Sequence, residues 1–144
     1  MSDPRGLRTR ANICRRSAAN TYDISQLALI RLATLTNIFA DIPGSLPDEL
    51  VQTLLTAANF RVERIVSRGH SSPAGFWYDQ HESEWVLLVS GAARIDMEGQ
   101  QPVTLGPGDF LNIPAHQRHR VDRTDPTQPT IWLAIHYRDA GEAI

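Results

Sequence analysis

Two segments of the chain hold most of the side chains that could carry out chemistry. The first, residues 75–91, places carboxylates, an amide and an imidazole between positions 79 and 84 and then becomes apolar. The second, residues 106–119, ends with His116 and His119. Imidazole and carboxylate groups held together bind divalent metal ions or exchange protons with a substrate near neutral pH. If the fold brings the two segments together, they predict one site inside a barrel.

The sequence around these residues reads as a series of short strands. Residues 60–66 alternate apolar with charged side chains, so one face of this strand is expected to be buried and the other wet. Further strands are expected at residues 76–80, 84–89, 92–97, 102–105, 110–113, 119–123 and 130–137, separated by turns rich in Gly and Pro. Many short antiparallel strands without βαβ alternation predict an all-β sandwich or barrel.

The N-terminal part is expected to differ from the rest. Residues 47–58 are predicted to form a helix, with a proline and acidic residues in the first turn and an apolar stripe along one face. Residues 1–36 are predicted to be a disordered extension and residues 37–144 the folded domain. A short helix at residues 27–35 and a targeting role for this basic segment are alternatives for the extension.

Composition and charge exclude several classes of protein. A chain of 144 residues with 42% apolar residues fits one soluble domain. Residues 1–36 hold six Arg against two Asp, and the rest holds eight Arg against fourteen acidic residues. The folded part is therefore acidic, which argues against a nucleic-acid partner. No apolar run is long enough to span a membrane, and Cys14 is the single cysteine, so a cytoplasmic protein without disulfides is expected.

The second segment resembles a motif of the cupins, whose fold is a jelly-roll barrel with a metal or ligand site in its lumen. That motif is G-x5-P-x-G-x2-H-x3-N. Gly108, Pro114 and His119 reproduce its spacing, with His116 where the family has Gly and Arg123 where it has Asn. The resemblance implies an all-β jelly-roll barrel for the folded domain, beginning with the short helix.

The other cupin motif, G-x5-H-x-H-x3,4-E-x6-G, is matched only at its end, by Glu84 and Gly91. With three residues before the glutamate, the two histidine positions fall on Tyr78 and Gln80; with four, they fall on Trp77 and Asp79. His81 is close by but out of register. Neither spacing supplies a histidine.

The resemblance implies a divalent metal ion, Zn, Mn, Fe or Ni, in the lumen. The expected ligands are Glu84 and His119, joined by Asp79, Gln80 or His81. Such an oxygen-rich set would hold a transition metal more weakly than three imidazoles do.

Each candidate also has a purely structural interpretation. His119 could be a hydrogen-bonded barrel histidine and Glu84 a carboxylate at the rim in water. Tyr78 and His116 are candidates for ligand binding at the mouth of the barrel, where an aromatic ring could hold a sugar or an aromatic acid. His136 reads as a core or interface histidine.

Two functions follow, and the sequence does not decide between them. The first is a metal-dependent enzyme acting on a small polar organic molecule. The second is a ligand-binding or sensing protein without catalysis and without metal. Edge strands and aromatic-rich strands in such a small barrel also predict a homodimer.

Overall fold

The computed structural model of the chain describes residues 33–138. The predicted extension, residues 1–36, and the alternative helix at residues 27–35 lie almost wholly outside these residues, so both stay predictions. Within the described residues the chain forms strands and no helix, and thus none that could cross a membrane.

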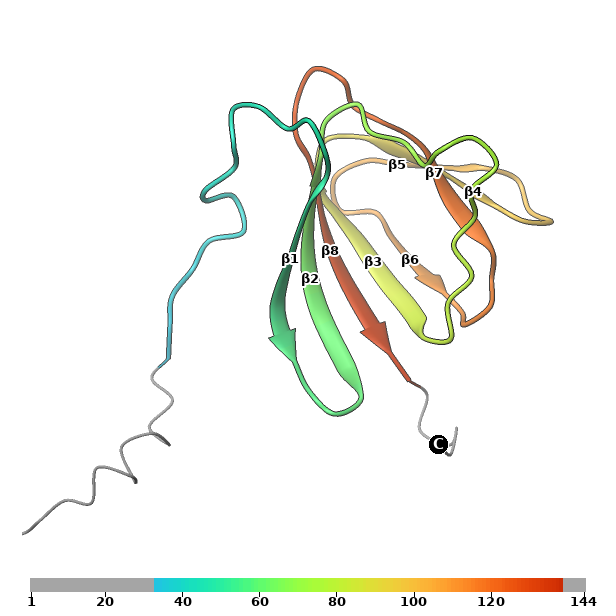
Figure 1. Cartoon of the computed structure of the whole chain (residues 1–144), viewed down its shortest axis with the longest axis horizontal. Helices are drawn as coiled ribbons and strands as arrows, with labels where there is room; N and C mark the ends of the chain where they lie inside the picture. Colours follow the sequence, from blue (N-terminus) through green and yellow to red (C-terminus); the bar gives the residue numbers. More distant parts are fainter. Residues whose placement is uncertain (1–32, 139–144) are drawn as a thin grey trace, which may run out of the picture. The chain divides into compact units, whose positions relative to one another are not determined.

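Eight strands form two antiparallel sheets that enclose a barrel (Figure 1). The larger sheet has the order β1-β2-β8-β3-β6 and the smaller one the order β5-β4-β7. The strands are β1 (Leu50–Thr56), β2 (Phe60–Ser67), β3 (Ser83–Ser90), β4 (Ala93–Met97), β5 (Val103–Leu105), β6 (Phe110–Ile113), β7 (His119–Thr124) and β8 (Thr130–Tyr137). The predicted all-β jelly-roll barrel is confirmed.

The helix predicted over residues 47–58 is wrong, because these residues contain β1. This strand pairs with β2 in an antiparallel register that places Leu50 opposite Val66. Thr and Val in the segment favour extended backbone, and the hydrogen bonds to β2 outweigh the weak helical preference of the rest. The apolar spacing that suggested a helical stripe instead leaves Leu54 and Leu55 about half exposed on an edge strand.

The strand predicted at residues 76–80 is reduced to one bridge. Tyr78 pairs with His119 at the start of β7 through backbone hydrogen bonds in both directions, of 2.8 and 3.2 Å. This bridge brings the segment before β3 alongside β7. The two segments that hold most of the titratable and polar candidates, residues 75–91 and 106–119, therefore lie side by side.

Apolar side chains from both sheets fill the interior. One cluster of buried side chains, none more than 4% exposed, consists of Val86, Leu88, Ala93, Ile95, Leu105, Ile113, Trp132 and Ala134. Because side chains alternate along a strand, Glu84 shares its face of β3 with Val86 and Leu88 and points into the barrel. The same alternation in β8 places His136 on the face of Trp132 and Ala134.

Arg64 of β2 fastens the polypeptide that precedes β1 to the larger sheet. Its guanidinium is buried and donates to the carbonyl oxygens of Ile38 and Ala40 at 2.7 and 2.6 Å. Its other nitrogens donate to the side-chain oxygen of Gln52 on β1. The planar fork of arginine can satisfy three acceptors at once, so one side chain holds both β1 and the lead-in segment.

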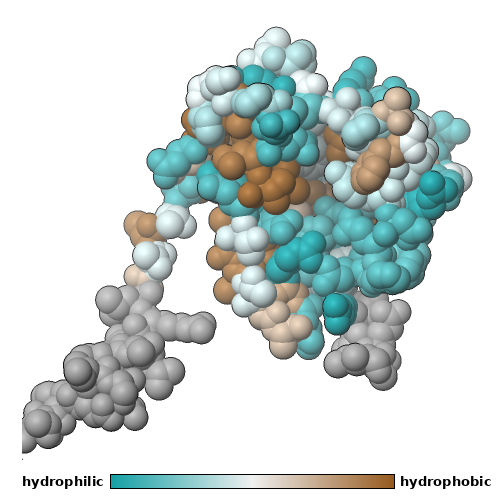
Figure 2. All heavy atoms as spheres, in the orientation of Figure 1, coloured by the Kyte–Doolittle hydropathy of each residue, from teal (hydrophilic) through white to brown (hydrophobic). Residues whose placement is uncertain are grey.

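The edge strand β1 carries exposed apolar side chains, which Figure 2 shows as a brown patch. Val51, Leu54 and Leu55 are each more than half exposed. An open strand edge with such residues is suited to pairing with another chain. The homodimer expected from the sequence stays a proposal, and this edge is a surface it could use.

Gly91, directly after β3, occupies a position that no other residue fits. Its φ is +86°, and a Cβ there would lie 2.5 Å from Oγ1 and 2.6 Å from Cα of Thr130 in β8. Gly99, in the turn between β4 and β5, has a similar φ of +76°, but a Cβ on Gly99 would have no atom within 4 Å. Comparing substitutions at the two glycines therefore separates the effect of backbone strain from that of steric crowding.

We expect Gly91→Ala to destabilise the fold by about 3 kcal/mol or more, because left-handed strain and overpacking against Thr130 add together. Gly99→Ala should cost only about 1 kcal/mol, from strain alone. Urea denaturation followed by circular dichroism measures both free energies of unfolding. Equal losses in the two variants would contradict the close approach of Gly91 to β8.

Candidate functional site

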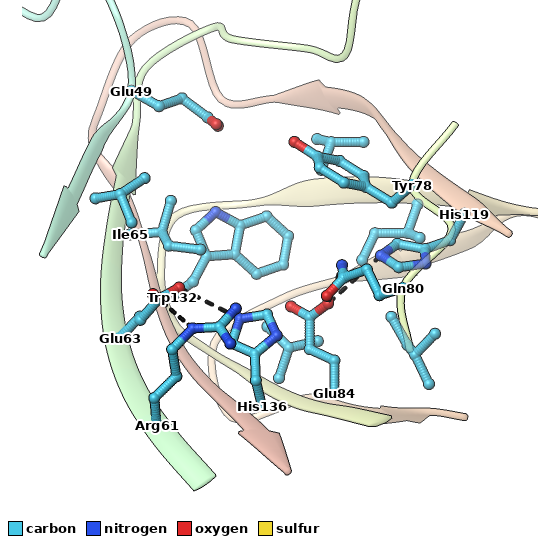
Figure 3. Close-up of a pocket in the computed structure, with 15 residues that line it drawn as sticks. Glu49, Arg61, Glu63, Ile65, Tyr78, Gln80, Glu84, His119, Trp132 and His136 are labelled. Carbon is cyan, nitrogen blue, oxygen red and sulfur yellow. Dashed lines mark hydrogen bonds and ion pairs between the residues drawn. The ribbon is translucent and has the colours of Figure 1, made fainter. Parts of the chain in front are cut away.

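A cavity of about 330 Å³ lies inside the barrel. Its apolar wall is formed by Val51, Ile65, Val86, Ile95, Ile113, Val121 and Trp132. Its polar lining is formed by Glu49, Arg61, Glu63, Tyr78, Gln80, Glu84, His119 and His136 (Figure 3). An apolar cavity with a few converging polar groups is the usual form of a small-molecule site.

Glu84 and His119 form an ion pair in this cavity. His119 Nε2 lies 3.5 Å from Glu84 Oε2, and both side chains are nearly buried, at 8% and 12% exposure. His119 Nδ1 donates a hydrogen bond to the carbonyl oxygen of Gln117 at 2.9 Å. A carbonyl oxygen can only accept, so Nδ1 carries a proton and Nε2 is the atom presented to Glu84 and the cavity.

The pair shifts the pKa of both partners toward the charged forms. Burial by itself raises the pKa of Glu84, but the hydrogen bond with His119, the charges of His136 and His119, and the amide of Gln80 outweigh it, so the pKa is lowered. Burial by itself lowers the pKa of His119, but the bonds to Glu84 and Gln117 outweigh it, so the pKa is raised. The pair therefore favours an ionised Glu84 and a protonated His119 in a mostly apolar cavity.

Tyr78 and Gln80 complete the same end of the cavity. The Tyr78 ring stacks on His119 with centroids 5.4 Å apart, and Gln80 Nε2 lies 3.4 Å from Glu84 Oε2. These are the two positions at which the three-residue spacing of the first motif expects histidines. The three-residue spacing of the first motif is therefore the one that fits this chain. Tyr78 and Gln80 place a phenol and an amide where the motif has imidazoles.

The remaining predicted site residues lie outside the cavity lining. Asp79, His81 and His116 are exposed. They form a separate surface cluster in which His116 Nδ1 is 3.0 Å from Asp79 Oδ1 and the two imidazole rings are 4.8 Å apart. The structure thus brings Tyr78, Gln80, Glu84 and His119 together, and it sets the other three apart.

The cavity residues do not fit the metal set of the first motif. At the positions of the two motifs only one imidazole, His119, and one carboxylate, Glu84, are present. In the part of the chain that the structure describes, no three His, Cys, Asp or Glu side chains are arranged to hold a metal ion. Burial, followed by the charges of Glu49 and Glu84, raises the pKa of the Tyr78 phenol, so it stays neutral and is a poor ligand. The chemistry proposed for this cavity therefore rests on its side chains alone.

A second pair of titratable residues lies beside the first. His136 Nε2 is 3.3 Å from Glu63 Oε2, and Arg61 Nε donates to Glu63 Oε1 at 2.9 Å. The sheet register places Arg61 opposite His136 and His136 opposite Glu84. Arg61, His136 and Glu84 therefore form one row across β2, β8 and β3, with Glu63 beside it (Figure 3).

Sequence reasoning missed Arg61, Glu63 and Glu49 as lining residues. The alternation in residues 60–66 predicts a buried face and a wet face, but the face with Arg61 and Glu63 lines the lumen of the barrel. Alternation separates the two faces of a strand without showing which one faces a polar cavity. The sequence signal that could have identified the lining was the charged pair Arg61 and Glu63, which are two residues apart and therefore on one face of the strand.

Fold and cavity together define a two-sheet β-barrel with a polar-ended cavity in its lumen. The sequence matches the family model of the cupin domain over residues 64–136, which is half of the chain. The chain belongs to the cupin family.

Solved structures support this membership. A proposed mannose-6-phosphate isomerase from Ralstonia eutropha JMP134 is 49% identical, with a TM-score of 0.72, over 74% of this chain and 100% of that chain. A cupin superfamily protein from Desulfitobacterium hafniense DCB-2 is 21% identical, with a TM-score of 0.57, over 68% and 84%. An RmlC-like cupin with a double-stranded β-helix fold from Methanocaldococcus jannaschii is 14% identical, with a TM-score of 0.53, over 67% and 86%. The last two share the fold alone, and no curated protein matches the sequence.

We expect Glu84→Gln to lower the pKa of His119, because the opposing charge is lost while burial remains. The chemical shift of the His119 ring protons, followed by NMR as a function of pH, measures this pKa. Glu98→Gln is the matched control, since that carboxylate is exposed and bound to Arg118. A His119 pKa that is the same in both variants would show that the two cavity groups do not interact.

Proposed function

We propose that this cupin binds a small polar organic molecule in its lumen and transfers protons on it through His119 and Glu84. The observation that carries this proposal is the ion pair itself, which holds an acid and a base at one end of an apolar cavity. A protonated imidazole and an ionised carboxylate are the starting states that such a pair requires. Burial keeps water away from both groups and strengthens their effect on a bound molecule.

Isomerisation of a hydroxy-carbonyl compound is the reaction that suits this pair best. Glu84 would remove a proton from the carbon next to the carbonyl group, while His119 would give a proton to the carbonyl oxygen, forming an enediol. Returning one proton to the other carbon and removing one from the other oxygen completes the reaction, with no further reactant. The name of the 49% identical Ralstonia protein, a proposed sugar-phosphate isomerase, points to the same class of chemistry.

Binding without catalysis is the alternative. The absence of the expected histidines at Tyr78 and Gln80 favours it, because the chemistry those histidines would support with a metal is lost. In that case Glu84 and His119 would serve only to fix the polar end of a ligand. Proton exchange with solvent separates the two functions, since a binding protein leaves the carbon-bound hydrogens of its ligand in place.

We predict that the protein exchanges solvent deuterium into a hydroxy-carbonyl sugar. Mannose, fructose and their 6-phosphates, incubated in D₂O, are suitable probes, and loss of the H2 or H1 signal in the NMR spectrum measures exchange. Glu84→Gln and His119→Gln should each slow exchange by about 100-fold or more, because each removes one of the two proton-transfer groups.

His70→Gln controls for the loss of an imidazole elsewhere, since His70 is not among the residues that line the cavity. It should exchange at the wild-type rate. Wild-type rates in Glu84→Gln or His119→Gln would overturn the assignment of these two residues. Binding of a probe without exchange would support the binding function.

We also predict that Tyr78 and Gln80 determine whether the lumen holds a metal ion. The wild-type protein, purified without tag or chelator and then dialysed against Zn, Mn, Fe or Ni, should retain less than about a tenth of an equivalent, because one imidazole and one carboxylate are too few ligands. The double variant Tyr78→His, Gln80→His should retain about one equivalent, because it supplies three imidazoles and a carboxylate.

Elemental analysis measures both proteins. Adding His119→Ala to the double variant should remove the metal again, which locates it in the lumen. Stoichiometric metal in the wild type, lost in His119→Ala, would instead show that Glu84, His119 and Gln80 suffice as a metal site.

A further inference from the structure

Residues 70–80 form a strap that runs beside β7, an edge strand of the smaller sheet (Figure 1). Near one end of the strap, the backbone N–H of Ser72 donates to the Val121 carbonyl oxygen at 2.8 Å, and Ser72 Oγ accepts from the backbone N–H of Val121 at 3.0 Å. Near the other end is the two-way backbone bridge between Tyr78 and His119. The strap therefore occupies the edge of the sheet that carries His119.

Two consecutive side chains of the strap lie on opposite faces of this edge. Tyr78 lines the cavity, where its ring stacks on His119 with centroids 5.4 Å apart (Figure 3). Trp77 lies against the guanidinium groups of Arg118 and Arg120, each 5.7 Å from the centroid of its ring. Side chains alternate along an extended chain, so both arginines lie on the outer face when His119 points inward. Trp77 and Tyr78 thus grip the start of β7 from outside and from inside.

Carboxylates hold the two arginines in position. Arg118 Nη1 donates to Glu98 Oε1 at 2.6 Å. Arg120 lies between two carboxylates of the smaller sheet, with its Nε 3.6 Å from Asp96 Oδ2 and its Nη2 3.7 Å from Asp122 Oδ1. The guanidinium groups are therefore a fixed platform, and indole is the aromatic ring that attracts cations best.

The part of the strap before Trp77 gives Tyr78 little support. Gly75 has a φ of +78°, and a Cβ on it would have no atom within 4 Å. The ring of Phe76 meets that of Tyr78 edge-on at 4.8 Å, but Phe76 is itself 43% exposed. A Tyr78 ring that left His119 would admit water to the buried end of the cavity.

We propose that Trp77 is a positioning residue, which holds Tyr78 against His119 by anchoring the strap on Arg118 and Arg120 from the outer face of the smaller sheet. Its consequence for catalysis rests on the proposed function, because the stack keeps water from the proton-transfer pair. The stack itself is a property of the folded protein without a ligand.

The ring protons of His119 in the NMR spectrum of the full-length protein report on the stack, because the Tyr78 ring shifts their signals. Tyr78→Leu gives the positions of these signals without the stack. Trp77→Leu, which stays apolar but loses the aromatic face, should move them about halfway or more toward those positions. Trp77→Phe, which keeps an aromatic face for the arginines, should restore most of the wild-type shift. Trp85→Leu is the matched control, since that indole packs on Phe110 instead.

Amide hydrogen exchange measures the attachment of the strap directly. The Tyr78 amide donates to the His119 carbonyl oxygen at 2.8 Å, so it exchanges only when the bridge opens. Trp77→Leu should speed this exchange about fivefold or more. The Leu88 amide, bonded to the Asp109 carbonyl oxygen outside the strap, should be little affected.

The arginines give a second route if Trp77→Leu does not fold. The double variant Arg118→Gln, Arg120→Gln removes both charges and leaves the indole in place. It should reproduce both effects of Trp77→Leu, and adding Trp77→Leu to it should change little further.

Wild-type His119 signals and a wild-type Tyr78 exchange rate in Trp77→Leu would overturn the anchor. The same results in the double arginine variant, or a Trp77→Phe variant as altered as Trp77→Leu, would also overturn it. These measurements need no substrate, so their failure leaves the proposed proton transfer standing. Conversely, a protein that exchanges no deuterium into the sugars, but whose His119 signals move as predicted, contradicts the proposed function and supports the anchor.

Discussion

The Glu84 carboxylate inside an apolar barrel is the constraint on which the site depends. An ionised group that is removed from water must be compensated by partners, or it takes up a proton. His119 supplies the opposing charge, and Gln80 and the neighbouring His136 add to it. His119 can do so because the Gln117 carbonyl fixes its tautomer and ring orientation. The polar end of the lumen is thus one interacting unit, and a change in any member shifts the protonation of the others.

The sheet register makes this unit possible. Because directly opposite residues in adjacent strands point to the same face, one transverse row brings Arg61, His136 and Glu84 together from three strands that are distant in sequence. Arg61 in this row is paired with both Glu63 and Glu82, so its guanidinium is engaged by the protein. The same row explains why the arginine is unavailable to a ligand. A one-residue slip of β8 would turn His136 to the outside and leave Glu84 and Glu63 facing each other.

The sequence predicted the strands better than it predicted the site. Alternation and turn residues located β2 to β8 closely, since both signals are local. The helix predicted for residues 47–58 was wrong because local helical and extended preferences were close. Pairing with β2, a tertiary contact, decided for the strand. Within the site, Glu84, His119, Tyr78 and Gln80 were candidates because of the resemblance to the spacing of the cupin motifs. Asp79 and His81 were candidates because the sequence does not show which residues of the segment before β3 face the lumen. The Tyr78–His119 bridge decides this, and no local pattern reveals that bridge. Glu63 was missed because a charged face in a strand normally faces water.

Tyr78 and Gln80 determine the chemistry of one end of the lumen. Both residues occupy the positions of the family's histidines, one stacked on His119 and the other beside Glu84. A neutral phenol and an amide are weaker ligands for transition metals than imidazoles, but they can bind hydroxyl groups as donors and acceptors. Tyr78 and Gln80 therefore present hydrogen-bonding groups to the lumen at the positions where the motif has imidazoles.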